Sequence, residues 1–171
     1  MFTTKMRAIT MAAVVGFLVT ATNLAADEGG TFSIIRSYAR NHATLEHAAG
    51  TISTGSLEGT ITTLASSGEP FTQGDHSLIS CLFYATSTAE GVSIEAPCTI
   101  TDGSGDRWYT MSRRDAGDMA SGGGGEGRLE LMGGTGKYAG VTGTCTYEAS
   151  YLTQDRVVSD GDCTWERSNA D

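Results

Sequence analysis

Four cysteines are the residues of this chain whose chemistry depends most directly on spacing. Cys145 and Cys163 lie in two segments, 141–151 and 157–166, in which alternate residues are apolar or small, the pattern of β-strands with one buried face. A hairpin that turns near Gln154 places Cys145 opposite Cys163, where a disulfide fits. The same register sets each large ring against a glycine: Trp165 faces Gly143, and Tyr147 faces Gly161.

Cys81 and Cys98 form a second pair by the same reasoning. Segments 79–85 and 94–100 also alternate, and a turn within residues 88–91 places Cys81 opposite Cys98. We therefore expect disulfides 81–98 and 145–163, because only these pairs occupy opposed positions of one hairpin. Four cysteines allow three connectivities, so bridges between the two hairpins remain an alternative.

Disulfides form in an oxidising compartment, and residues 1–26 predict how the chain reaches one. Lys5 and Arg7 precede an apolar run over 8–19, and small residues follow, as in a secretory signal peptide. A membrane anchor would need about 20 apolar residues, more than this run supplies, and no later segment could span a bilayer. We expect a secreted or periplasmic protein in which residues 27–171 form a single β-barrel domain.

The composition excludes some partners and narrows the fold class. The 171 residues include 20 acidic and 11 basic ones, a net charge of −9, and removal of Lys5 and Arg7 makes the charge more negative. Such a chain repels nucleic acid and anionic membranes. It has 23 glycines and only 2 prolines, and short alternating segments lie between turn residues, which indicates an all-β sandwich or barrel.

Alternation predicts the remaining strands as well. They lie near 32–38, 51–54, 57–65, 107–112 and 128–132, which gives eight or nine strands in all. Residues 33–49 also fit a helix, because apolar residues recur there at helical spacing, but we favour the strand. Two long loops are predicted, 66–75 and 113–127. Four consecutive glycines in the second make it a flexible connector or, as the sharper alternative, a lid.

Catalytic groups are scarce on the face that carries the cysteines. In the two hairpins this face offers only the hydroxyls of Ser77, Ser159, Tyr147 and Tyr151, with no carboxylate or histidine for acid–base catalysis. The other segments supply the remaining candidates: Arg36, His42, Glu46, His47, His76, Asp106 and Arg107. No triad of Ser, His and acid can be assembled from this spacing, which argues against a hydrolase.

The glycine-rich stretch 133–143 is not a phosphate-binding loop. A P-loop requires Gly where Leu131 stands and Ser or Thr where Tyr138 stands. The segment 102–106 spaces carboxylate and hydroxyl side chains as a calcium loop does, but it lacks the bidentate glutamate, so we favour a hairpin turn. We expect no metal and no cofactor.

The stretch from Gly133 to Gly143, GGTGKYAGVTG, leads directly into a long strand and resembles the signature of the allene oxide cyclase and dirigent barrels. It also resembles bacterial secreted proteins with an allene oxide cyclase-like barrel of the calycin type. The resemblance implies an eight-stranded antiparallel up-and-down barrel, here with two disulfides. Its structural turn residues are Gly133, Gly134, Gly136, Tyr138, Gly140 and Gly143. The glycines permit positive φ or close backbone approach, and Tyr138 can plug one end of the barrel.

The resemblance also bears on function. In plant members the barrel holds an apolar small molecule and directs its cyclisation or radical coupling, often as a trimer. No catalytic residue carries over to a position here, so the resemblance implies a cavity and not a reaction. The chain would then be a monomer or a homo-oligomer such as a trimer.

Two hypotheses of function follow. The first is a binding module for a small hydrophobic molecule, or an interaction module of the cell envelope, without enzymatic activity. The alternative is a cyclase or isomerase of the allene oxide cyclase or dirigent type that confines its substrate and needs Arg36, Asp106 or Arg107 inside the barrel. The predicted cavity lining is aromatic: Phe83, Trp108, Tyr147, Tyr151 and Trp165. The competing interpretation is that these rings simply fill the barrel.

Overall fold

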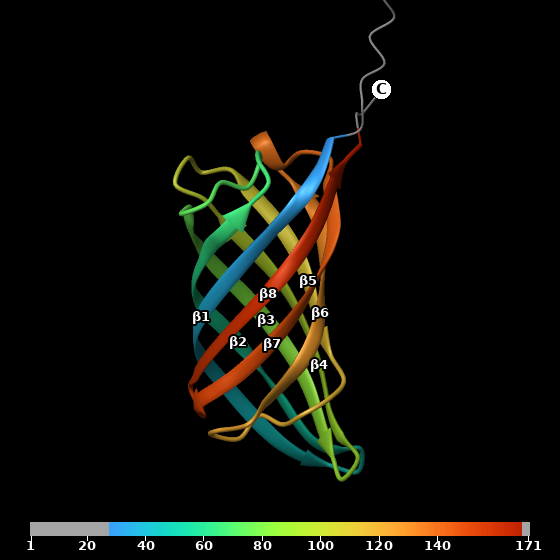
Figure 1. Cartoon of the computed structure of the whole chain (residues 1–171). Helices are drawn as coiled ribbons and strands as arrows, with labels where there is room; N and C mark the ends of the chain where they lie inside the picture. The colour runs from blue at the N-terminus through green and yellow to red at the C-terminus, as the bar shows by residue number, and fades with distance from the viewer. Residues whose placement is uncertain (1–27, 169–171) are drawn as a thin grey trace, which may run out of the picture.

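The computed structural model describes residues 28–168, which form eight antiparallel strands and a short 3-10 helix (Figure 1). The elements are β1 (Glu28–His47), β2 (Gly50–Ser66), β3 (His76–Thr88), β4 (Gly91–Thr101), β5 (Arg107–Arg114), β6 (Gly124–Gly134), η1 (Gly136–Tyr138), β7 (Val141–Thr153) and β8 (Arg156–Arg167). Within this range no helix is long and apolar enough to cross a membrane. The predicted signal peptide, residues 1–26, lies outside the described residues and stays a prediction.

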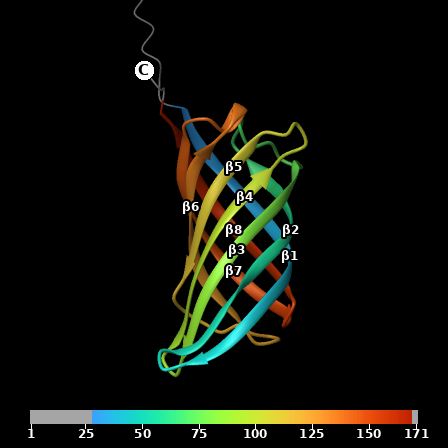
Figure 2. The ribbon, with the colours of Figure 1, turned by 180° about the vertical axis from the view of Figure 1, so that it is seen from behind.

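Each strand pairs with its neighbours along the chain, and β1 pairs with β8 to close the barrel. The view from behind shows β3, β4 and β5 continuing the same wall (Figure 2). Closure satisfies the backbone of every strand without leaving a free sheet edge. The predicted eight-stranded antiparallel up-and-down barrel is confirmed.

Both predicted disulfides are confirmed. Cys81–Cys98 joins β3 to β4 and Cys145–Cys163 joins β7 to β8, with Cα atoms 4.1 and 4.0 Å apart. The paired cysteines face one another in the strand register, as the alternation predicted. Bridges between the two hairpins are therefore excluded.

Three predicted boundaries differ from the structure. Residues 33–47 of the segment 33–49 belong to the 20-residue strand β1, which confirms the strand and not the helix, and residues 48–49 form the turn to β2. Segments 51–54 and 57–65 form one strand, β2, because β1 pairs with it along its whole length. The connection predicted over 113–127 is shorter, since β5 runs to Arg114 and β6 begins at Gly124.

The glycines of this β5–β6 connection are used for backbone pairing. The N–H of Gly122 donates to the carbonyl of Tyr151 over 2.7 Å, and the N–H of Tyr151 donates to the carbonyl of Gly123 over 2.9 Å. A Cβ on Gly124 would lie 2.0 Å from the carbonyl oxygen of Ala149, so only glycine allows this approach. The connection therefore crosses the lower end of the barrel in Figure 1 and is attached to β7.

The end of the barrel at which β1 begins and β8 ends, the upper end in Figure 1, is filled by a cluster of rings that we call the aromatic end. It consists of Phe32, Phe71, Trp108, Tyr138 and Trp165, each at most 6% exposed. Phe71 comes from the β2–β3 connection, and its ring stacks on Phe32 with 3.8 Å between centroids. The edge of Trp108 meets Phe71 at 5.3 Å. Because rings fill this end, any space for a ligand inside the barrel lies at the other end.

Candidate functional site

A cavity of about 50 Å³ lies inside the other half of the barrel. Its wall combines apolar residues with hydroxyl and guanidinium groups: Arg36, Tyr38, Leu57, Ile94, Ala96, Cys98, Ser112, Arg114, Tyr147, Ala149, Tyr151, Val157 and Ser159. These residues come from six of the strands, all except β3 and β6, and each occupies an inward position of the period-2 pattern. We call this region, with the adjoining Arg40, the arginine end.

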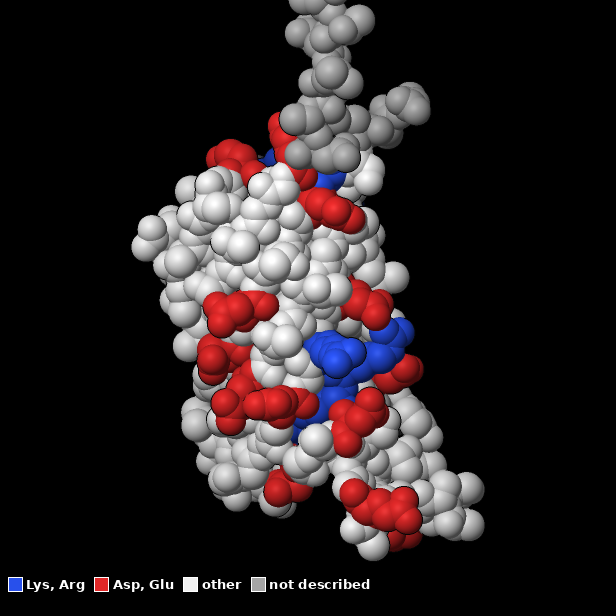
Figure 3. Space-filling view, turned by 45° about the vertical axis from the view of Figure 1, so that its right-hand side comes forward, with Lys and Arg blue, Asp and Glu red and all other residues white. Residues whose placement is uncertain are grey.

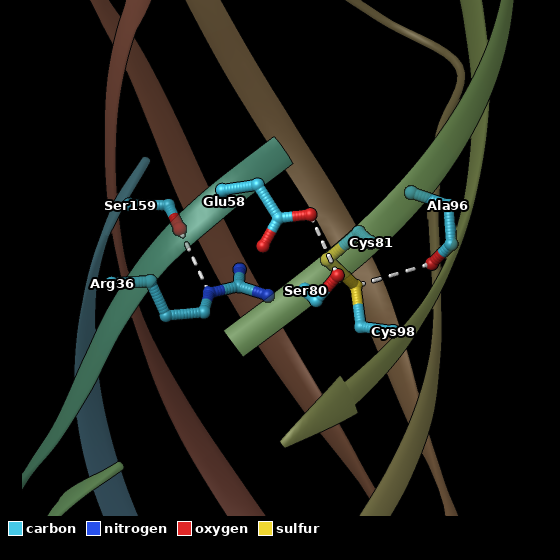
Figure 4. Close-up of a disulfide and its surroundings, with 7 residues drawn as sticks. All are labelled: Arg36, Glu58, Ser80, Cys81, Ala96, Cys98 and Ser159. Carbon is cyan, nitrogen blue, oxygen red and sulfur yellow. Dashed lines mark hydrogen bonds between the residues drawn. A yellow bond between two sulfur atoms is a disulfide. The ribbon is translucent and has the colours of Figure 1, made fainter. Parts of the chain in front are cut away.

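Arg36 enters the cavity from β1. Its Nε donates to the hydroxyl of Ser159 on β8 over 2.9 Å (Figure 4). Its guanidinium carbon lies 4.6 Å from the ring centroid of Tyr147, which is cation–π geometry. Arg36 is 2% exposed, and Cys98 of the disulfide drawn in the same figure lines the same cavity.

Arg40 and Arg114 lie over the ring of Tyr151. Their guanidinium carbons are 5.1 and 5.4 Å from its centroid. Arg114 donates through Nη2 to the carbonyl of Asp118, in the β5–β6 connection, over 3.0 Å, and to the hydroxyl of Tyr151 over 3.4 Å. The connection is thus attached to the same arginine that lines the cavity.

Several polar atoms of the arginine end lack a hydrogen-bond partner within the described residues. They are Nε of Arg40, Nη1 of Arg114 and the hydroxyl oxygen of Ser112. Buried polar groups without a partner are uncommon in folded proteins and mark places where a water, ion or ligand binds. The arrangement is therefore a cluster of hydrogen-bond donors with positive charge inside the barrel.

The two tyrosines nearest Arg36 are held in their protonated form. Burial raises the pKa of Tyr38, against the opposing positive charge of Arg36. Burial likewise raises the pKa of Tyr147, while Arg36 and Arg114 act in the other direction. Both hydroxyls are therefore hydrogen-bond donors at neutral pH and not general bases.

The ring of Tyr147 can lie inside the barrel because its neighbours are small. Gly161 faces it on β8, as the sequence register predicted. Gly127 faces it on β6, where a Cβ would lie 2.4 Å from Cζ of the ring. A larger residue at either position would push Tyr147 into the cavity.

The five aromatic residues predicted to line a cavity are divided between the two ends. Tyr147 and Tyr151 line the arginine-end cavity. Trp108 and Trp165 belong to the packed aromatic end, and Phe83 packs in a small separate cluster with alanines of β3 and β4. Their part in ligand binding stays a prediction, and the cavity position favours the two tyrosines.

The other candidates from the sequence are dispersed. Arg36 lies in the cavity, but Arg107 is exposed on β5. Asp106 lies in the β4–β5 connection at the aromatic end, where its carboxylate accepts the N–H of Lys137 over 3.1 Å. His42, Glu46, His47 and His76 lie on β1 and β3 and outside the cavity lining. The three groups proposed for a cyclase are therefore not brought together.

Arg40 and Arg114 are the functional candidates that the sequence analysis missed. The predicted strands 32–38 and 107–112 each end one inward position before the arginine. Continuing the alternation by two residues from Tyr38 and from Ser112 would have placed both arginines inside the barrel. Phe71 was missed because it lies in a predicted loop.

The glycine-rich corner lies at the aromatic end, where Asp102, Lys137 and Tyr138 form a polar cluster. Gly133, Gly136 and Gly140 have φ values of 81°, 53° and 71°, which other residues adopt at a cost. Tyr138 is buried, and its hydroxyl donates to Asp102 over 3.3 Å. Burial and the nearby Asp102 charge raise the pKa of Tyr138 to about 12, against the opposing charge of Lys137.

The carboxylate of Asp102 organises the β4–β5 turn. It accepts the backbone N–H groups of Ser104 and Asp106 over 2.8 and 3.1 Å. Lys137 reaches its other oxygen at 3.1 Å. Burial by itself raises the pKa of Asp102, but the hydrogen bonds from Ser104 and Lys137 outweigh burial and lower it to about 2. The spacing of polar side chains over 102–106, which also fits a calcium loop, is thus explained by the hydrogen bonds of a turn.

The outer wall differs in charge from the interior. On the face shown in Figure 3, acidic side chains gather around a smaller basic group. Arg113 of β5 points outward and pairs with Glu95 and Glu130 at 3.2 and 2.9 Å. Glu58 on β2 accepts a hydrogen bond from Ser80 on the same outer side (Figure 4). The positive charge of the arginine end is therefore confined to the interior.

Comparison with solved structures agrees with this architecture. The pterocarpan synthase dirigent protein GePTS1 superposes with a TM-score of 0.54 at 11% sequence identity, over 85% of this chain and 88% of that chain. The pterocarpan synthase dirigent protein PsPTS1 gives a TM-score of 0.49 at 12% identity, over 85% and 98% of the two chains. No family model and no curated protein matches the sequence. The likeness to GePTS1 shows that this chain has the barrel fold of a dirigent protein.

Proposed function

We propose that this protein binds a small molecule in the cavity of the arginine end, after export to an oxidising compartment under the direction of residues 1–26. The observation that carries the proposal is the cavity itself. It lies inside the barrel, between tyrosine rings and guanidinium groups, and its polar atoms are only partly used by the protein. Two disulfides support an oxidising compartment.

The size of the cavity limits the guest. A volume of about 50 Å³ holds a few water molecules or a group of similar size, whereas pockets for drug-sized ligands measure about 300 to 1,000 Å³. The guest is therefore a small molecule, or a larger one of which only the polar group enters. The sequence led us to expect an apolar ligand. Because Arg36, Arg114 and Ser159 line the cavity, we now propose an amphipathic ligand.

A second candidate is a cyclase or isomerase of the dirigent or allene oxide cyclase type. The barrel fold shared with the dirigent protein GePTS1 and the polar groups inside the cavity favour it. The hydroxyl of Tyr38, which burial keeps protonated, could stabilise developing negative charge on a confined guest, whereas that of Tyr147 already donates to the carbonyl of Arg113 over 3.4 Å. Turnover that is lost on Tyr38→Phe while binding is retained would distinguish this candidate from a binding protein.

Filling the cavity tests the proposal. Ala149 lines the cavity from β7 and is 7% exposed, whereas Ser150, the next residue, points outward. We expect small molecules released by denaturing the purified protein, measured by mass spectrometry, to include a compound that is missing from the Ala149→Leu variant. The Ser150→Leu variant should retain it. Circular dichroism and the mass of the oxidised chain establish that both variants are folded. No released compound, or equal recovery from all three proteins, contradicts the proposal.

A further inference from the structure

Three guanidinium groups in the arginine end have no carboxylate partner among residues 28–168. Arg36 and Arg114 are 2% exposed, and Arg40 is 7% exposed. Their nearest partners are a hydroxyl, a carbonyl and the rings of two tyrosines. On the surface, by contrast, Arg113 and Arg167 each pair with a glutamate. The charges of these two arginines are compensated by carboxylates, whereas the three buried charges of the arginine end are not.

This burial has an energetic cost that the described residues do not offset. Arginine stays protonated inside proteins, so the charge cannot be relieved by loss of a proton. Burying an uncompensated charge is strongly unfavourable, and a cation–π contact offsets only part of this cost. Nε of Arg40 and Nη1 of Arg114 also lack acceptors. An anion in the cavity would supply the missing negative charge and an acceptor for Nη1 of Arg114, which lines it.

We propose that the arginine-end cavity binds the carboxylate group of a small organic acid. The inference rests on the proposed small-molecule function and names the class of its ligand. A carboxylate is planar, offers about four acceptor positions on two oxygens and pairs with guanidinium groups through two parallel hydrogen bonds. Its size suits a space of about 50 Å³. The free hydroxyl of Ser112 adds a neutral donor beside Arg114.

The surroundings of the cavity favour selectivity for this one group. The tyrosine rings and the side chains of Ala96, Ala149 and Val157 provide an apolar wall for the body of the acid. The net charge of the chain is −9 and its outer face carries many acidic side chains (Figure 3). Anions are therefore repelled from the outer surface, and a preference for them has to come from the interior.

Calorimetric titration of the full, disulfide-bonded protein with sodium acetate and with acetamide tests the proposal, because these probes have the same shape and differ in charge. We expect acetate to bind at least about tenfold more tightly than acetamide. Arg114→Met and, independently, Arg36→Met should each weaken acetate binding by about tenfold and leave acetamide unchanged within about twofold. Arg113→Met removes the same charge from the adjacent, outward position and serves as the control.

The outcomes separate this inference from the proposed function on which it rests. Equal affinities for acetate and acetamide, both lost in Ala149→Leu, would overturn the carboxylate assignment and leave the small-molecule site. Binding of neither probe would overturn the carboxylate assignment, and the small-molecule site would then be decided by the compound released from the purified protein. Inorganic phosphate that binds more tightly than acetate would replace carboxylate as the ligand class and so overturn the assignment. Weakening by Arg113→Met equal to that by Arg114→Met would show that the effect arises from net charge and not from the cavity.

Discussion

The two ends of this barrel are built from the same strands and the same alternation, yet they differ in content. At the aromatic end, Phe71 stacks on Phe32 and meets Trp108, so that rings fill the interior. At the arginine end, inward positions of the same strands carry Arg36 and Arg114 around a cavity. The same eight strands run through both ends, with register shifts at Trp108/Thr110 and Tyr151/Thr153, so the main difference lies in the inward side chains.

This difference indicates that one end of the barrel stabilises the fold and the other end binds a ligand. Close packing of rings stabilises the fold, because buried apolar area and dispersion contacts contribute most of the folding free energy. Buried charge and unused hydrogen-bond donors oppose folding, and they are retained where they serve binding. We therefore expect substitutions at the aromatic end to change stability and those at the arginine end to change ligand affinity.

The largest expected effect is on the aromatic end. Trp108→Ala should lower the free energy of unfolding by about 3 to 5 kcal/mol, because it removes a buried indole that contacts Phe71 and Tyr138. Tyr109→Ala, at the adjacent outward position of β5, should cost less than about 1 kcal/mol. Urea unfolding followed by circular dichroism measures both. Similar losses for the two variants would mean that the aromatic end is not the stabilising part.

The aromatic end and the arginine end were not equally predictable from the sequence. Strict alternation around the four cysteines determined the strand register and both disulfides, because only one register places small residues opposite large rings. Phe71 could not be placed, since a residue in a long connection has no periodicity to indicate which way it points. Alternation did contain the positions of Arg40 and Arg114, but arginine is usually exposed, and the predicted strands ended before both.

The cavity itself could not be predicted from the sequence. Whether inward side chains fill a barrel depends on strand tilt and on the direction each side chain takes, and neither is set by the residue types alone. The same five aromatic residues were compatible with a lined cavity and with a filled interior. In the structure Trp108 and Trp165 are in the filled part, and Tyr147 and Tyr151 are in the open part.

The two disulfides provide the next comparison, because one of them contributes to the cavity wall and the other does not. Each closes a segment of similar length, with sequence separations of 17 and 18, so removal of either pair by Cys→Ala should cost about 3 kcal/mol. Only Cys98 lines the cavity. We expect the Cys81→Ala, Cys98→Ala variant to alter acetate affinity and the Cys145→Ala, Cys163→Ala variant to leave it within about twofold. Calorimetric titration and urea unfolding of both variants check this, and equal changes in affinity would contradict this assignment of roles to the two ends.

A smaller effect is expected from pH at the aromatic end. The pKa of Asp102 is lowered from its ordinary value of 3.8 to about 2 in the folded protein, so its charged form favours folding. This contribution is present above pH 4 and is lost as the pH falls from 4 towards 2. We expect about 1 kcal/mol to be lost over that range, after allowance for solvent screening of Lys137. In Asp102→Asn this part of the pH dependence should be absent in urea unfolding, and an unchanged profile would assign it to other carboxylates.

The smallest expected change in stability has the opposite sign and lies at the arginine end. Arg114→Met removes a buried charge that has no carboxylate partner within the described chain and replaces it with an apolar side chain of similar length. Without ligand, we expect the free energy of unfolding to rise by about 1 kcal/mol or to stay unchanged, although the hydrogen bond to the Asp118 carbonyl is lost. Arg114→Lys keeps the charge and should not stabilise the protein.

Unfolding in urea with and without sodium acetate gives this comparison its sharpest form. Acetate should stabilise the original protein by mass action and stabilise Arg114→Met less at the same concentration, so that the order of stability of the two proteins reverses as acetate is added. A loss of about 2 kcal/mol or more in ligand-free Arg114→Met would mean that Arg114 holds the β5–β6 connection as a structural residue. The arginine end would then share the stabilising role of the aromatic end. A reversal on adding acetate would instead show that the protein gives up stability at this end in order to bind an anion.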